Sequence, residues 1–171
     1  TKPDNFVKAA RLGLTECAHV PTELLSDEEI AEVAATGMTF TATASIFDMV
    51  SAETGEQIMD AVLSNIGRLY HAGVSLAVGT DFMFENPPYQ TVGIPMHELR
   101  LLAKAGLTVE EVIRCATIES AEHCGVADET GSLEAGKLAD IIAVSGTIDD
   151  TFAALKTMDF VMHCGAVVKN S

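Results

Sequence analysis

The sequence predicts an α/β fold in which parallel β-strands alternate with helices. Three short apolar stretches without helix breakers read as buried strands, and segments with helical periodicity lie between them. The predicted strands span 14–20, 38–44 and 74–78. Strands that alternate with helices at spacings of about 20 to 40 residues are typical of parallel βαβ units.

The helices are predicted from apolar stripes and from capping patterns. Ser26 with Glu29 forms a capping box, and so does Thr108 with Glu111. The predicted helices span 4–11, 26–37, 58–73, 97–105, 109–116 and 118–124.

Two segments are predicted to be loops. Residues 45–55 follow the second strand and are expected to be irregular. Residues 82–95 contain Pro87, Pro88 and Pro95, which break regular structure. A loop this long in a compact domain often covers a functional site.

The C-terminal part changes character and is predicted to be mostly β. A turn-rich stretch over 131–137 precedes a strand over 138–144, and residues 160–169 read as a hairpin folded about Cys164 and Gly165. We therefore predict two parts, an α/β body over 1–126 and a β-strand appendage over 127–171.

Composition excludes several classes of protein. Twenty-five acidic and ten basic residues give a formal net charge of -15, which repels phosphate backbones and anionic membrane surfaces. No apolar run approaches the ~20 residues that span a bilayer. The four cysteines form no CxxC pair and are expected to be buried, reduced thiols. These features favour a cytoplasmic protein that binds neither nucleic acid nor membrane.

Two ionisable residues fall at the predicted carboxyl ends of strands, where functional groups of parallel α/β folds gather. His19 follows the first strand, and Asp81 follows the third within Gly79-Thr80-Asp81. An imidazole and a carboxylate suit a divalent zinc, manganese or iron ion. A structural histidine and a loop-capping aspartate explain the same residues.

The loop over 82–95 and the helix after it offer candidate substrate contacts. His97 begins the helix at the same edge as Asp81, and Tyr89 lies within the loop. Both side chains have structural alternatives, because His97 can serve as an N-terminal helix contact and Tyr89 can pack the loop down.

Several ordered sequence blocks resemble the C-terminal part of the metal-dependent amidohydrolase superfamily. These blocks read GVSLAVGTD, HELRLLAKAGLTVEEVIRCAT, GSLEAGKLADIIAV and the closing VMHCGAVVKN. The upstream stretch ECAHVPTELLSDEEIAEVAATGMTFTAT resembles the family's sixth and seventh barrel strands with the helix between them. The blocks are most similar to the branch that contains imidazolonepropionases and prolidase-like enzymes.

The resemblance implies part of a (β/α)8 barrel of the TIM type, about strands 6–8 with their helices, followed by strands of a small composite β-sandwich subdomain. It implies that His19 and Asp81 are metal ligands and that Asp81 is also the catalytic general base toward the attacking water. The family's other ligands, an HxH pair, a bridging carboxylate and a further histidine, have no counterpart in the 171 residues. The complete enzyme is thus expected to bind a divalent metal, zinc by preference, and this chain alone to hold none tightly.

Length agrees with a partial barrel, because a complete (β/α)8 barrel needs ~250 residues. We expect a hydrolase portion that acts on a C–N bond of an amide, cyclic amide or peptide through a metal-activated water, and that is inactive alone. Its expected partners are a small-molecule substrate, the missing N-terminal half of the barrel and further copies of itself. The alternative is a non-catalytic α/β module or half-barrel that works by oligomerising. A nucleotide-binding domain is excluded by the lack of a glycine-rich loop.

Overall fold

The computed structural model describes residues 2–171, which form two compact units. The first unit ends at Leu107, and the second spans Thr108–Ser171. The predicted assignment of residues 1–126 to a barrel body and 127–171 to an appendage stays a prediction about the complete protein.

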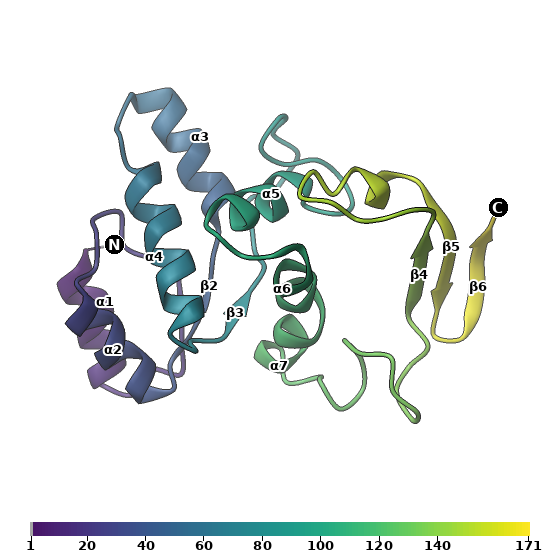
Figure 1. Cartoon of the computed structure of the whole chain (residues 1–171), viewed down its shortest axis with the longest axis horizontal. Helices are drawn as coiled ribbons and strands as arrows, with labels where there is room; N and C mark the ends of the chain where they lie inside the picture. Colours follow the sequence, from purple (N-terminus) through teal and green to yellow (C-terminus); the bar gives the residue numbers. More distant parts are fainter. Residues whose placement is uncertain (1) are drawn as a thin grey trace. The chain divides into compact units, whose positions relative to one another are not determined.

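The first unit contains a three-stranded parallel sheet in the order β1-β2-β3. In its register, Cys17 pairs with Phe40, and Phe40 pairs with Leu76 (Figure 1). The strands are β1 (Glu16–Ala18), β2 (Thr39–Thr41) and β3 (Leu76–Ala77). All three predicted strands of this part are therefore confirmed, in the predicted parallel arrangement and with shorter lengths.

Five helices belong to the first unit, and four of them were predicted. They are α1 (Pro3–Arg11), α2 (Asp27–Thr36), α3 (Ala44–Thr54), α4 (Met59–His71) and α5 (Met96–Lys104). The capping box at Ser26 is formed as predicted, with the Ser26 hydroxyl accepting from the backbone N–H of Glu29.

Helix α3 contradicts the prediction that residues 45–55 form a loop. Its N-cap residue Thr43 makes no side-chain cap, and the carboxylate of Glu98 in α5 receives the backbone N–H groups of Ala44 and Ser45 instead. The cap thus comes from a residue more than fifty positions away. A search for local capping patterns has no means of finding such a helix start.

The core of the first unit lies between the sheet and its helices. Phe40 and Leu76 pair across β2 and β3 and are fully buried, as are Ile66 and Leu69 of α4 and Leu102 of α5. Burial of each such side chain stabilises the fold by about 1.5–3 kcal/mol.

A buried asparagine fixes the segment that follows β1. The Asn65 side chain accepts from the backbone N–H of Leu25 and donates to the carbonyls of Pro21 and Glu23. Asn65 is fully buried in α4, so these three bonds hold the segment after His19 against that helix.

The second unit begins with helical turns and ends with an antiparallel sheet in the order β4-β5-β6 (Figure 1). The predicted C-terminal hairpin is confirmed, with Cys164 and Gly165 between β5 and β6. The elements are α6 (Val109–Arg114), a π-helical turn (Cys115–Glu119), α7 (Ser120–His123), β4 (Ile141–Val144), a 3-10 turn (Ala153–Lys156), β5 (Met158–His163) and β6 (Ala166–Asn170).

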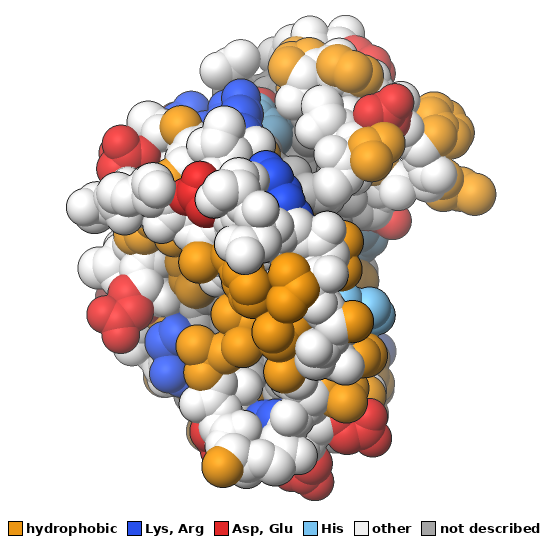
Figure 2. All heavy atoms as spheres, turned by 90° about the vertical axis from the view of Figure 1, so that its right-hand side faces the viewer, with side chains coloured by type: hydrophobic (Ala, Val, Ile, Leu, Met, Phe, Trp, Pro, Cys, Tyr) orange, Lys and Arg blue, Asp and Glu red, His pale blue; other side chains and the backbone are white. Residues whose placement is uncertain are grey.

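The β4-β5-β6 sheet leaves apolar side chains exposed. Ile142 of β4 and Val167 and Val168 of β6 are about half exposed or more. Figure 2 looks from the side of this sheet and shows hydrophobic side chains gathered on the visible face.

The prediction that all four cysteines are buried is wrong. Cys115 is buried and Cys17 is half-buried, whereas Cys124 and Cys164 are exposed. Cys164 is exposed because it occupies a hairpin turn, and Cys124 because it follows the last turn of α7. All four are free thiols.

Across residues 2–171, none of the helices is both long enough and apolar enough to cross a membrane.

Candidate active site

The first unit brings together the two residues that were predicted to bind a metal. His19 follows β1 directly, and Asp81 follows β3 after three intervening residues. The Nε2 atom of His19 lies 3.7 Å from Oδ2 of Asp81. The side chains are 34% and 57% exposed, so both are accessible to a small ligand.

Each of the three strands is followed by a non-glycine residue in the left-handed backbone region. His19 has φ 68°, Thr43 has φ 53° and Asp81 has φ 60°. A left-handed residue with a side chain costs about 1–2 kcal/mol. Such strain concentrates at functional sites, where surrounding contacts hold the residue in place.

The hydroxyl of Thr43 fixes the orientation of the His19 ring. Its Oγ1 lies 2.7 Å from Nδ1 of His19, which leaves Nε2 facing Asp81. Phe47 of α3 adds an edge-to-face contact, with ring centroids 5.8 Å apart. A hydrogen bond at one ring nitrogen is the usual way in which a protein presents the other nitrogen to a metal.

The start of α3, next to Thr43, is held by a fully buried carboxylate. Glu98 accepts from the backbone N–H groups of Ala44 and Ser45 at 2.7 Å each, and from the Ser45 hydroxyl at 2.6 Å. Burial raises the pKa of Glu98 to about 7, although the hydrogen bonds from Ser45 and Ala44 oppose this shift. Glu98 thus supports, through α3, the threonine that orients His19.

The glycine of the Gly79-Thr80-Asp81 sequence is required by a close approach. A Cβ atom at Gly79 would lie 2.5 Å from Cγ2 of Thr41, which is closer than real atoms come. Glycine therefore lets the chain that leads to Asp81 pass directly beside the end of β2.

The predicted substrate contacts His97 and Tyr89 also lie together. Their rings meet edge to face with centroids 5.6 Å apart, and Nε2 of His97 lies 2.7 Å from Oδ2 of Asp48 in α3. His97 is 20% exposed and therefore mostly enclosed by these partners. The geometry pairs the two predicted residues, and their role in substrate binding stays a prediction.

Helix α3 contacts both candidate histidines through consecutive residues. Phe47 packs against His19, and Asp48 pairs with His97. Sequence reasoning missed both residues because their helix was predicted as a loop. Glu98 carried a usable signal, since it lies on the apolar face of a predicted helix beside Leu99 and Leu102.

The donor set of His19 and Asp81 fits a divalent metal. Two light-atom ligands at about 2.05 Å from a tetrahedral ion lie about 3.4 Å apart. The separation of 3.7 Å between Nε2 of His19 and Oδ2 of Asp81 is close to that spacing. Two side chains are fewer than the three protein ligands of a catalytic zinc site, so these residues would form part of one.

Among residues 2–171, one cluster contains three side chains that could bind the same metal ion, and it does not include His19 or Asp81. That group consists of Asp140, His163 and Cys164, all within the second unit.

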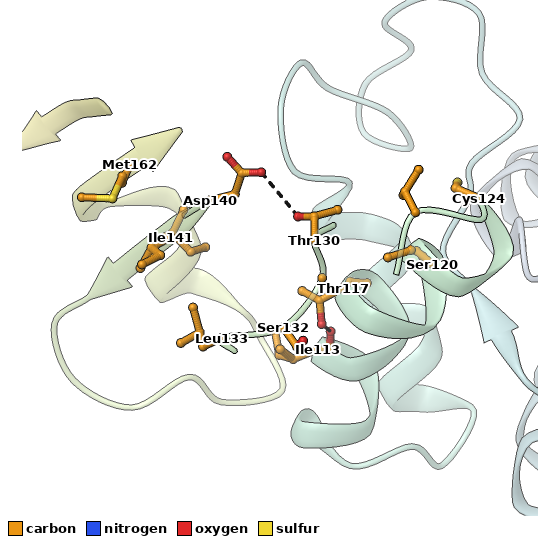
Figure 3. A pocket seen from close by; sticks show the side chains of 15 residues that line it. Ile113, Thr117, Ser120, Cys124, Thr130, Ser132, Leu133, Asp140, Ile141 and Met162 are labelled. Carbon is orange, nitrogen blue, oxygen red and sulfur yellow. Dashed lines mark hydrogen bonds between the residues drawn. The ribbon is translucent and has the colours of Figure 1, made fainter. Parts of the chain in front are cut away.

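The second unit also holds a cavity of about 710 Å³ between its helical turns and its sheet (Figure 3). Apolar side chains from both sides line it, including Ile113, Ile141 and Met162. None of the predicted site residues lines the cavity, because they all belong to the first unit.

The family model that describes the amidohydrolase family matches residues 2–169 of the chain. The chain therefore belongs to the amidohydrolase family. Within it, the chain is similar to imidazolonepropionases in sequence and to prolidase-like enzymes in fold. The family and these two similarities agree with the branch expected from the sequence blocks.

One similar protein is an imidazolonepropionase of Brevibacillus brevis, which is 32% identical over 145 residues. The match covers 84% of this chain and 30% of that protein. A second imidazolonepropionase, from Shouchella clausii, is 29% identical over 147 residues, with 84% of this chain and 32% of that protein covered. The chain thus spans about a third of the length of these relatives.

Solved structures resemble the chain over nearly its whole length. An amidohydrolase structure matches with a TM-score of 0.80 at 27% identity, covering 99% of this chain and 43% of that one. A Xaa-Pro dipeptidase with bound methionine in its active site matches with a TM-score of 0.80 at 23% identity, covering 98% and 43%. These likenesses agree with the predicted α/β fold and relate it to amidohydrolases of the TIM-barrel type.

Proposed function

We propose that the chain is the C-terminal portion of a metal-dependent amidohydrolase that hydrolyses a C–N bond of an amide, cyclic amide or peptide. The observation that carries the proposal is the pair formed by His19 Nε2 and Asp81 Oδ2 at 3.7 Å, with the imidazole oriented by Thr43. Membership of the amidohydrolase family supports hydrolysis in general.

Asp81 serves as metal ligand and general base. Its carboxylate stands at a strand end in a constrained backbone conformation and is more than half exposed, so it can reach a water molecule. Asp81 accepts the proton of the attacking water and passes it to the leaving nitrogen as the C–N bond breaks. A divalent cation held by His19 and Asp81, zinc by the chemistry of these donors, would polarise the carbonyl and acidify the water.

His97 and Tyr89 are proposed to bind the substrate. Oδ2 of Asp48 lies 2.7 Å from Nε2 of His97, and the rings of Tyr89 and His97 meet edge to face. The loop that carries Tyr89 also exposes Met83 and Phe84, at 96% and 77%, which are available for contact with an apolar part of a substrate. This arrangement suits a small molecule with both polar and apolar groups.

The complete site needs groups that the chain does not supply. Two ligands leave a catalytic metal short of at least one protein donor, so the chain alone is proposed to be inactive. In the complete barrel, β1–β3 would be strands 6–8. The remaining ligands would come from the N-terminal half of the barrel, whose strands would pair with them. The β4–β6 strands would belong to the small β-sandwich subdomain, and the whole enzyme would act in the cytoplasm.

The alternative function, assembly without catalysis, is favoured by the open edges of the β1-β2-β3 sheet. Within the described chain, β1 pairs on one side only, with β2, and Leu14 just before it is 47% exposed. An open edge of this kind promotes association. Light scattering of the 18.1 kDa chain should therefore give a mass above that of the monomer, as a symmetric dimer.

The proposed function is tested by Asp81→Asn and His19→Ala in the complete protein, with turnover and metal content measured together. Asp81→Asn should lower turnover by about 10²–10⁴ while metal stays bound. His19→Ala should lower metal content. Asp60→Asn, at an exposed position in the first turn of α4, is the matched control and should change neither. Near-normal turnover in metal-loaded Asp81→Asn would overturn the assignment of Asp81 as general base and leave it as a structural anchor of its loop.

A further inference from the structure

Three metal-ligating side chains of different chemistry meet at the hairpin of the second unit. Asp140 precedes β4, His163 ends β5, and Cys164 is the first residue of the turn between β5 and β6. Oδ1 of Asp140 lies 2.8 Å from Nδ1 of His163. The Sγ atom of Cys164 lies 3.8 Å from Nδ1 and 3.7 Å from Nε2 of the same ring.

Backbone hydrogen bonds hold the Asp140 carboxylate and the turn in place. The N–H of Cys164 donates to Oδ1 of Asp140 at 2.8 Å, and the N–H of Gly165 donates to the carbonyl of Ala139 at 3.1 Å. The turn is thereby tied to the residues that lead into β4. A preformed set of ligands loses less conformational freedom on binding than a set of loose surface side chains.

The residue type at position 164 is unusual for its backbone. Cys164 and Gly165 both have positive φ, 48° and 78°, as in the two-residue turns for which asparagine, aspartate and glycine are preferred at the first position. A cysteine at this position accepts backbone strain and places a thiol beside an imidazole and a carboxylate. Local turn preference therefore does not account for the cysteine.

In contrast to the expectation that the chain alone holds no metal tightly, we propose that Asp140, His163 and Cys164 form a binding site for a zinc-class divalent cation. Ligands at about 2.3 Å for sulfur and 2.05 Å for nitrogen lie about 3.6 Å apart around a tetrahedral ion. Only one ring nitrogen can share an ion with the sulfur, and the Cys164 sulfur lies 3.8 Å from Nδ1 of His163, the nitrogen that also faces Asp140. Because Nε2 is equally close to the sulfur, at 3.7 Å, the thiol lies over the ring and would turn toward the ion on binding. The distance between Oδ1 of Asp140 and Nδ1 of His163 would increase by about half an ångström as the cation replaces the proton between these atoms.

The donor set narrows the choice of cation. One thiolate, one imidazole and one carboxylate match the borderline character of Zn²⁺ and of its spectroscopic substitute Co²⁺, whereas Mg²⁺ and Ca²⁺ prefer oxygen alone. The His163 side chain is 74% exposed, so water can complete the fourth position. The bound cation would clamp the β5–β6 turn to the start of β4 and stabilise the sheet.

The experiment titrates Co²⁺ into the reduced chain and follows the sulfur-to-cobalt absorption in the near ultraviolet. One equivalent should saturate the band, and Zn²⁺ should displace it. Cys164→Asn should abolish the band while the turn keeps a residue that it favours. His163→Asn should weaken Zn²⁺ binding at least about 10-fold, because even the loss of a residue that supports a ligand costs 10–100-fold.

Two controls separate this site from other metal ligands in the chain. Cys124→Ser removes the other exposed thiol, and His19→Ala removes the proposed ligand of the first unit, and both should keep the band. Zn²⁺ should also raise the urea midpoint of the unchanged chain and not that of Cys164→Asn. The proposal is overturned if the band is absent, if it survives Cys164→Asn, or if Cys124→Ser or His19→Ala removes it.

Discussion

Glu98 and Ser45 are joined by two hydrogen bonds that end on the same carboxylate oxygen. Oε2 of Glu98 accepts the backbone N–H of Ser45 at 2.7 Å and its hydroxyl at 2.6 Å. The other oxygen accepts from Ala44, so one buried side chain caps the start of α3. The helix so fixed carries the contacts to both His19 and His97.

Loss of this carboxylate should destabilise the first unit. Glu98→Ala leaves three buried donors without an acceptor and should lower the free energy of unfolding by at least about 2 kcal/mol, since one unsatisfied buried group costs about 1–3 kcal/mol. Urea denaturation of the chain measures the change. Glu56→Ala, an exposed glutamate of the same unit, should stay within about 0.5 kcal/mol. An equal loss in the two variants would show that the cap contributes nothing specific.

Glu98 should also make stability depend on pH between about 4.5 and 7. Burial raises its folded-state pKa from 4.5 to about 7, so the folded chain binds the extra proton in this range. The free energy of unfolding should therefore fall as the pH rises through the range, by up to about 1.4 kcal/mol per pH unit. The contribution is fully present below pH 4.5 and lost above pH 7.

Denaturation of the chain and of Glu98→Gln at a series of pH values isolates this term, because glutamine does not titrate. The difference between the two unfolding free energies should change across the range and be flat outside it. A difference that is constant from pH 4 to pH 8 would mean that Glu98 titrates normally in the folded chain.

Thr43→Val should affect the proposed metal site more than the stability of the fold. Valine keeps the β-branched shape and removes the hydroxyl that lies 2.7 Å from His19 Nδ1. In the complete protein, metal affinity measured by chelator competition should drop about 10–100-fold. Thr39→Val, in the same strand region but bonded to the carbonyl of Thr15, should retain affinity. If Thr43→Val and Thr39→Val bind the metal with equal affinity, contacts other than the Thr43 hydroxyl must orient the His19 ring.

The sequence allowed good prediction of elements whose signals are local. The capping boxes at Ser26 and Thr108 are formed by neighbouring residues, and the hairpin at Cys164 and Gly165 lies between two apolar alternating runs. The strand ends that carry His19 and Asp81 were also placed correctly, because parallel strands share one carboxyl edge.

Features that depend on distant contacts were not predictable in this way. Helix α3 is capped by Glu98, and the ring of His19 is oriented by Thr43, which is 24 positions away. The grouping of Asp140 with His163 arises only when β4 pairs with β5. Contacts between residues far apart in the chain form only on folding, and no periodic pattern or fixed spacing in the sequence indicates them.

The three residues with left-handed backbone that follow the strands impose a trade-off between stability and the proposed activity. Glycine at position 19, 43 or 81 would relieve about 1–2 kcal/mol of backbone strain at each. Each such replacement would also remove a proposed metal ligand, the proposed general base or the residue that orients His19. Directed evolution for thermostability alone would thus favour glycine at these positions and lose the proposed catalytic activity. Selection for turnover would keep the three side chains together with their strained backbone. A thermostable variant of this chain that is meant to stay active should therefore keep its native residues at positions 19, 43 and 81.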